Sequence, residues 1–314
     1  EEQDPGKSLE EARQHSAVEM ETVVLLGAGF SRWAANLPLV SELFDFAIDP
    51  GNDREARRLE IVREAYEKWT VECPGANNEE FIAWARLNLK RFDYAGWYVT
   101  RRLTDPFISG SYIRRTFYIN SYYARENHGV GRAREFLEKI EATYGTPAIL
   151  TANYDLLVEY ALSTKGFHYG KPGEHIGSTP YPYIQPVYVT GRVPLLKLHG
   201  SLSWSVDGKS TTSRYGMTGK CLIVPPMAEK SPNKTFAWEW AEAGKYLRDA
   251  KRLIVFGFAF NPYDLAIRSL FSDNSSNLEE IISIDKYDQR ARLAEVFSCT
   301  NVRTINPVEG LILQ

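Results

Sequence analysis

The feature that most constrains the fold is an apolar, β-branched run that ends directly in glycines. Residues 22–26 read Thr-Val-Val-Leu-Leu and are followed by Gly27, Ala28 and Gly29. A run of this kind is typical of a central strand in a parallel sheet, because both faces of such a strand are buried. The glycines that follow predict a tight turn into a helix.

The other strand signals lie after residue 147, where they alternate with helical patterns. This alternation predicts an α/β fold, a Rossmann-like, doubly wound parallel sheet covered by helices on both faces. The pattern is helical from about residue 41 to residue 144, which predicts an inserted all-helical module that forms a separate lobe. Residues 1–21 are expected to form a polar N-terminal arm and residues 22–314 the main domain. Strands are expected at 22–26, 148–151, 194–198, 220–224, 252–256, 281–284 and 302–305, helices at 235–248 and 288–297, and a Gly-, Pro- and Tyr-rich loop at 165–186.

Composition excludes several classes of protein. The chain has 37 Lys and Arg against 40 Asp and Glu, so it lacks the basic excess of a nucleic-acid-binding protein, and no nucleic-acid partner is expected. Its three cysteines, Cys73, Cys221 and Cys299, are far apart and form no pair with zinc-site spacing. We therefore expect no zinc and a reducing, cytoplasmic compartment. No apolar run approaches the roughly 20 residues that a membrane-spanning helix needs, so no membrane partner is expected.

Polar residues follow several of the expected strands, at the edge where open α/β sheets bind ligands. The glycine turn allows a phosphate to approach the backbone, and the helix after it directs its N-terminal N–H groups at that anion. Arg32 replaces the third glycine of the dinucleotide-binding fingerprint, so a tight turn without a ligand is the alternative. The other polar groups at this edge are Thr151 to Asp155, His199 to Ser201, Gly257 to Phe260, and Asp285.

In their order along the chain, these motifs resemble the sirtuin family. The four-cysteine zinc ribbon of protein-deacylating sirtuins is missing, because the interval that would hold it contains only Cys221. In this respect the chain resembles the zinc-less, sirtuin-like NADase domains of bacterial antiphage defence proteins. The resemblance is carried by Gly27-Ala28-Gly29-Phe30-Ser31, Leu37-Pro38, Thr151-Ala152-Asn153-Tyr154-Asp155, Leu198-His199-Gly200, and the segment from Gly257 to Asp264.

The resemblance implies that NAD is the substrate and that its nicotinamide–ribose bond is hydrolysed. Asn153 is then expected to hold a water or a ribose hydroxyl, and His199 to accept a proton. Asp155 would order the nicotinamide pocket, its own loop or Asn153. A buried structural histidine and a helix N-cap are the alternatives for His199 and Asn153, and an N-cap is also the alternative for Asp285, which is otherwise expected to bind the adenosine ribose. The expected NAD-binding residues are Gly27, Ala28, Gly29, Phe30, Ser31, Leu37, Pro38, Thr151, Gly257, Phe258, Asp264 and Asp285.

Two other functions fit the same cleft. One is a module that senses NAD or ADP-ribose without turnover, and the other is an ADP-ribosyltransferase. The presence of both Asn153 and His199 favours catalysis, because a sensor needs neither. An NAD-depleting enzyme would kill its own cell if it were always active, so a regulatory partner chain or a homo-oligomer is expected.

Overall fold

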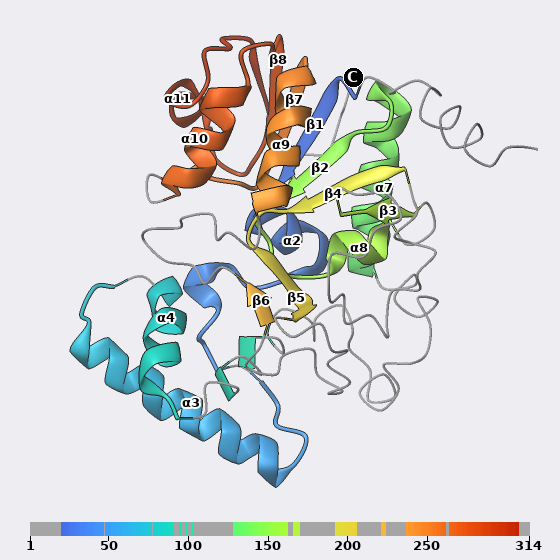
Figure 1. Ribbon diagram of the computed structural model, residues 1–314. Coiled ribbons are helices and arrows are strands. Elements are labelled where there is room, and N and C mark those ends of the chain that lie inside the picture. The colour runs from blue at the N-terminus through green and yellow to red at the C-terminus, as the bar shows by residue number, and fades with distance from the viewer. Residues whose placement is uncertain are drawn as a thin grey trace, which may run out of the picture.

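The computed structural model confirms the α/β fold and its parallel sheet (Figure 1). Seven strands lie in the order β3-β4-β2-β1-β7-β8-β9, and every neighbouring pair is parallel. The strands are β1 (Thr22–Leu26), β2 (Ala148–Thr151), β3 (Phe167–His168), β4 (Val193–Lys197), β7 (Arg252–Phe256), β8 (Glu280–Ile284) and β9 (Val302–Ile305). The structure describes residues 20–46, 48–76, 78–90, 94–95, 98–99, 102, 128–162, 166–169, 192–205, 221–223, 237–261 and 264–307.

The topology is that of a doubly wound sheet. The chain begins at the centre with β1 and builds outward through β2 and β4, then returns to add β7, β8 and β9 on the other side. Apart from the short edge strand β3, this is the Rossmann order 3-2-1-4-5-6. The core residues of β1 are fully buried, as expected for a strand with neighbours on both sides and helices on both faces.

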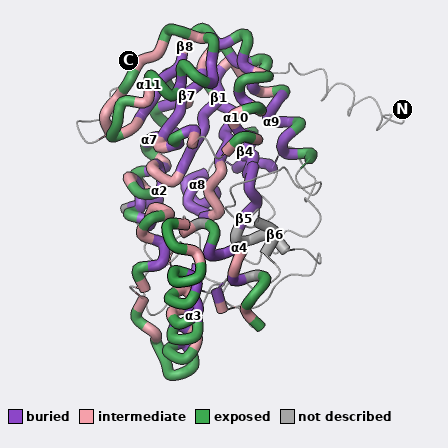
Figure 2. Tube along the Cα trace, turned by 90° about the vertical axis from the view of Figure 1, so that its left-hand side faces the viewer, coloured by how far each residue is buried: buried purple, intermediate pink, exposed green. Residues whose placement is uncertain are grey.

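Helices cover both faces of the sheet. Figure 2 shows the strands between α7 (His128–Tyr144) on one side and α9 (Ala237–Asp249) and α10 (Leu265–Asn274) on the other. On the α7 side, Phe30, Phe136 and Phe256 pack together at ring-centroid distances of 5.2–5.7 Å. Phe30 lies in α2 (Ala28–Ala35), Phe136 in α7 and Phe256 in β7, so the three rings bring these elements into one core. The helices around the sheet are α2 (Ala28–Ala35), α7 (His128–Tyr144), α8 (Leu157–Ala161), α9 (Ala237–Asp249), α10 (Leu265–Asn274) and α11 (Arg290–Ala294).

A second hydrophobic core lies in the helical segment between β1 and β2. Helices α3 (Asp53–Glu72) and α4 (Asn78–Asn88) and the 3-10 turn η1 (Val40–Glu42) surround it, below the sheet in Figure 1. Its centre is aromatic, with Phe44 and Phe81 packed edge-on at 4.8 Å. Helix α7 does not share this core, because its apolar face packs on the sheet with α2 and α8. The described part of the insert therefore divides between a lobe of its own and a helix of the main domain.

Two short elements differ from the expected strands. The expected strand at 220–224 does not join the parallel sheet; β6 (Cys221–Ile223) pairs antiparallel with β5 (Gly200–Ser205). Strand β3 lies inside the segment expected to be a loop. Most of the N-terminal arm, residues 1–19, and residues 170–186 of that loop lie outside the described residues. Within the described residues, no helix combines the length and apolar character needed to cross a bilayer.

His168 on β3 gives the fold an acid sensitivity. Burial lowers the pKa of His168, with Glu242 acting in the opposite direction. The unfolded chain protonates this histidine below about pH 6.5, whereas the folded chain resists protonation. Its contribution to stability is therefore present above that pH and is lost as the pH falls. We expect the Tm of wild type to drop more between pH 7.5 and 5.5 than the Tm of His168→Gln; an equal drop in both would contradict this.

Candidate functional site

The candidate site lies at the carboxyl edge of the sheet, around the switch point between β1 and β7. These strands are neighbours, but the chain connects them to opposite halves of the sheet. Loops that follow strands at such a point diverge, and ligands of open α/β sheets bind there. Predicted site residues follow β1, β2, β4, β7 and β8, so the topology brings these segments to one edge.

The glycines after β1 pack directly against the glycine after β7. The amide of Gly27 donates to Phe256 O at 2.9 Å, and that of Gly29 donates to Gly257 O at 3.0 Å. A Cβ added to Gly27 would lie 2.3 Å from Gly257 O, and one added to Gly29 would lie 2.7 Å from Gly257 Cα. Gly257 also has a φ of 61°, which favours glycine. The close approach of these two turns therefore requires glycine whether or not a phosphate binds. The sequence motif alone does not reveal this structural requirement.

The other residues of the first motif are mostly internal. The Phe30 side chain is fully buried among the aromatic rings of the core, and Leu37 and Pro38 are buried as well. Ala28 and Gly29 are half-buried. Of these five residues, Ala28 and Gly29 have the surface that a ligand could contact, while the side chains of the other three support the turn.

Thr151 and Asn153 tie the turn after β2 to the glycine turn. Thr151 Oγ1 donates to Leu26 O at 2.9 Å and accepts from the Asn153 amide at 3.0 Å. The Asn153 side chain then donates through Nδ2 to Gly27 O at 2.8 Å and to Ser31 Oγ at 3.0 Å. These bonds commit both Nδ2 hydrogens. Asn153 Oδ1 makes no hydrogen bond within the described residues, and the side chain is half-buried, so this oxygen is the group that Asn153 can offer to a ligand.

Asp155 orders the same turn. Its Oδ2 accepts from the Ser31 hydroxyl at 2.8 Å, and its Oδ1 accepts from the Leu157 amide at 3.0 Å, at the start of α8. Only 5% of Asp155 is exposed. Both carboxylate oxygens are engaged inside the protein, so the geometry favours an ordering role for Asp155, acting on its own loop and through Ser31 on Asn153.

His199 lies beside this turn, just after β4. The amide of the preceding Leu198 donates to Thr151 O at 2.9 Å, and Leu198 O accepts from Trp240 Nε1 at the same distance. The His199 ring lies 6.4 Å from the Tyr154 ring, measured between centroids, and the residue is 2% exposed. The structure thus brings His199 next to the Asn153 turn in a packed, low-dielectric setting.

The loop after β7 forms the other wall of this edge. Phe258 and Phe260 are buried and pack edge-on at 4.9 Å, so their side chains belong to the core. Phe260 has a φ of 43°, and its carbonyl accepts from Arg268 at 3.0 Å. Asp264 is half-buried just before α10 and makes no side-chain cap to that helix.

Asp285 follows β8 at the same edge. Its backbone amide donates to Ile305 O at 3.1 Å, and its Oδ1 accepts from the Tyr287 amide at 2.9 Å. One carboxylate oxygen of Asp285 is therefore used in this local turn. Asp285 is not the N-cap of α11, because that helix begins at Arg290 and its N-cap is Gln289. Asp285 is half-buried, so a ligand can reach it.

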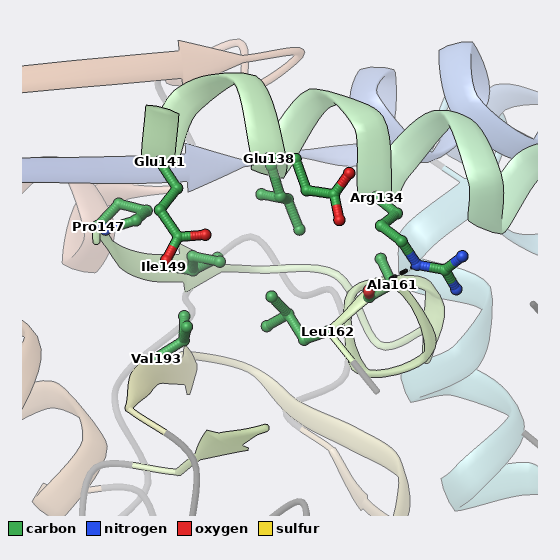
Figure 3. Close-up of a pocket in the computed structure, with 9 residues that line it drawn as sticks. Arg134, Glu138, Glu141, Pro147, Ile149, Ala161, Leu162 and Val193 are labelled. Carbon is green, nitrogen blue, oxygen red and sulfur yellow. Dashed lines mark hydrogen bonds between the residues drawn. The ribbon is translucent and has the colours of Figure 1, made fainter. Parts of the chain in front are cut away.

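No metal site is formed by the part of the chain that the structure describes. It contains no group of three or more His, Cys, Asp or Glu placed to hold an ion. Cys73 and Cys299 are free thiols. A shallow apolar pocket between α7, α8, β2 and β4 lies under Arg134, Glu138 and Glu141 (Figure 3), but it is near the amino ends of β2 and β4, away from the candidate site.

A comparison with protein families identifies part of this architecture. Residues 147–280 match the family described as SIR2-like domain. The match includes Asn153, Asp155, His199 and Gly257, whereas the glycine turn after β1 precedes it. No curated protein was found to match the chain.

Several solved sirtuin structures align with most of the chain at low sequence identity. A Sir2 complex with an inhibitor, 2'-O-acetyl-ADP-ribose and a deacetylated p53 peptide has 15% identity and a TM-score of 0.41, covering 96% of this chain and 94% of that chain. A complex of Sir2 with a p53 peptide and NAD+ has 16% identity and a TM-score of 0.39, covering 98% and 95%. A structure from work on the mechanism and regulation of Sir2 enzymes has 14% identity and a TM-score of 0.42, covering 90% and 86%.

Two buried charged residues lie next to the candidate site and were missed by sequence reasoning. Lys197 ends the otherwise apolar β4, and Glu159 lies in α8, whose residues are all buried. The two side chains form an ion pair of 2.8 Å, with 1% and 0% exposure. A single charged residue inside a buried strand, and another inside an otherwise apolar helix, was the signal in the sequence that could have found them.

Proposed function

We propose that this chain is an NAD glycohydrolase that cleaves NAD+ to nicotinamide and ADP-ribose. The observation that carries the proposal is the Asn153 side chain, which the glycine turn and Ser31 hold by Nδ2 while Oδ1 makes no hydrogen bond within the described residues. A rigid acceptor at the carboxyl edge of a Rossmann sheet suits the positioning of a water or a ribose hydroxyl. The SIR2-like match and the fold support NAD as the ligand.

The proposed chemistry is the hydrolysis of one glycosidic bond. The nicotinamide leaves with the electron pair of its bond to ribose, and positive charge develops on the ribose in an oxocarbenium-like transition state. Asn153 Oδ1 accepts a hydrogen bond from the water that attacks the anomeric carbon. His199 takes the proton that this water loses, the role of a general base. We assign the half-buried Asp285 to accept hydrogen bonds from the adenosine ribose hydroxyls.

We further propose that this hydrolysis depletes NAD in antiphage defence, under the control of a partner chain or of self-association. The proposal rests on the sequence resemblance to defence NADases and on the need to keep such an enzyme inactive in a healthy cell. Glu-, Lys- and Arg-rich α3 and the second core around it offer a lobe outside the candidate site on which such control could act.

The decisive experiment is incubation of the purified chain with NAD+ followed by analysis of the nucleotides and of the protein. We expect equimolar free nicotinamide and ADP-ribose, and no dependence on added zinc. ADP-ribose bound covalently to protein would favour a transferase instead. Saturable NAD+ binding without any product, at every chain concentration and with cell extract added, would contradict hydrolysis and favour a sensor.

A further inference from the structure

A buried ion pair lies directly beneath the candidate catalytic turn. Lys197 and Glu159 are almost completely shielded from solvent, and the Tyr169 hydroxyl donates to the same Glu159 oxygen at 3.3 Å. Burial raises the pKa of Glu159, while Lys197 opposes that shift. Removing two charges from water is costly, and a well-packed apolar pair is often equally stable or more stable at such a position. Stability alone therefore does not account for this pair.

The Lys197 ammonium has a second acceptor, and that acceptor belongs to the turn. Besides Glu159 it donates to the backbone carbonyl of Asp155. An apolar side chain could fill the same space, but it would leave this buried carbonyl without its donor. Lys197 thus performs one task that an apolar residue cannot perform.

The contacts continue from Lys197 to the substrate-facing amide. Asp155 accepts from Ser31, and Ser31 accepts from Asn153 Nδ2. Lys197 is also only two residues before His199 in the chain, at the end of β4. One ammonium group therefore connects the two segments that carry Asn153 and His199.

We propose that Lys197, held by Glu159, is a positioning residue that fixes the Asn153 turn relative to His199 for catalysis. The proposal rests on the NAD hydrolysis proposed above. In this proposal the ion pair aligns the reacting groups. Loss of the pair should therefore slow the chemical step and leave the affinity for NAD+ unchanged.

The test replaces the pair as a unit. Lys197→Met alone leaves the Glu159 charge buried without its cation, so its Tm is expected to fall sharply. The double variant Lys197→Met/Glu159→Leu is expected to recover the Tm while kcat stays at least about tenfold below wild type and KM for NAD+ changes less than about twofold. Amide exchange at Leu157, whose N–H is bound to Asp155 Oδ1, should become faster in the double variant.

A matched control is available at the opposite edge of the sheet. Arg252 and Glu280 form a 2.7 Å ion pair between the amino ends of β7 and β8. Arg252→Met/Glu280→Leu also replaces both partners of an ion pair by apolar residues, here a partly exposed pair between two strands, and we expect its kcat and its Leu157 exchange to match wild type.

The outcomes separate the positioning role from the function. An active wild type with a double variant of equal kcat, or with unchanged Leu157 exchange, overturns the positioning role and leaves hydrolysis standing. A wild type that releases no nicotinamide contradicts hydrolysis instead, and amide exchange still reports whether Lys197 orders the turn. If the double variant does not fold, Lys197→Arg keeps a cation beside Glu159 but changes the geometry of its N–H donors. We expect faster Leu157 exchange and a lower kcat in that variant; faster exchange with a wild-type kcat overturns the proposal.

Discussion

Asn153→Ala is expected to release nicotinamide at least about a hundredfold more slowly than wild type while still binding NAD+. The variant loses the Oδ1 acceptor that we assign to the attacking water. It also loses the Nδ2 bonds to Gly27 O and Ser31 Oγ, which costs about 1–3 kcal/mol of folding stability. The measurement is nicotinamide release at saturating NAD+, with a melting curve and a binding isotherm for each variant.

Asn78 provides the matched control for that loss of stability. Its Nδ2 also makes two hydrogen bonds, to Val40 O at 3.3 Å and Ser41 O at 3.1 Å, and its Oδ1 accepts from the Tyr66 hydroxyl at 2.5 Å, but all of these lie in the helical lobe. Asn78→Ala should therefore lower the Tm at least as much as Asn153→Ala and leave turnover unchanged. Wild-type turnover in Asn153→Ala would remove this residue from the mechanism.

His199→Ala is expected to slow turnover by about 10²–10⁴-fold, the usual effect of a lost general base. His199 is 2% exposed, so some loss of stability accompanies the truncation. His168→Ala is the control, because His168 is 5% exposed and lies on β3, outside the candidate site. If both variants lose activity in proportion to their Tm, His199 is a structural histidine.

Gly257→Ala is expected to destabilise the fold by about 3 kcal/mol or more, because it combines backbone strain with a backbone clash. The added Cβ would lie 2.4 Å from both Gly29 Cα and Phe30 N. Neither atom can move without displacing the start of α2. Urea unfolding followed by circular dichroism measures the loss.

Gly145 separates the two causes. Its φ is 80°, similar to the 61° of Gly257, but a Cβ there meets no atom within 4 Å. Gly145→Ala should therefore show the strain alone, about 1–2 kcal/mol. Equal losses in the two variants would show that the contact between the glycine turns is not tight. The same contact predicts that Gly29→Val lowers stability, and not only the affinity for NAD+.

The sequence predicted the parallel sheet well because its strands are buried on both faces. Residues 23–26 and 253–256 are continuous apolar runs, and residues 281–284 are apolar apart from Ser283, which local patterning reveals. It predicted β6 as part of the main sheet because a short apolar run carries no information about its partner. It placed α7 with the helical lobe for a similar reason, since an amphipathic pattern shows that a helix is half-buried but not what covers it.

The site was predicted less completely than the sheet. Sequence motifs located the turn that holds Asn153 and Asp155, because polar residues at strand ends are a local signal. They did not reveal that Asp155 is engaged on both oxygens, that Gly29 is needed for contact with Gly257, or that Lys197 and Glu159 pair. Each of these depends on residues distant in the chain that meet only after folding.

The two separate cores have a consequence for how this chain can vary. The free-energy cost of closing a loop grows only with the logarithm of its length, about 0.6 kcal/mol for each doubling. The lobe formed by η1, α3 and α4 has its own aromatic core, so contacts within the lobe, and not contacts with the sheet, stabilise its ordered state. Insertions, deletions and surface changes in α3 and α4 are therefore tolerated far more readily than changes at the carboxyl edge. A lobe of this kind can change its surface in evolution while the carboxyl edge of the sheet stays the same.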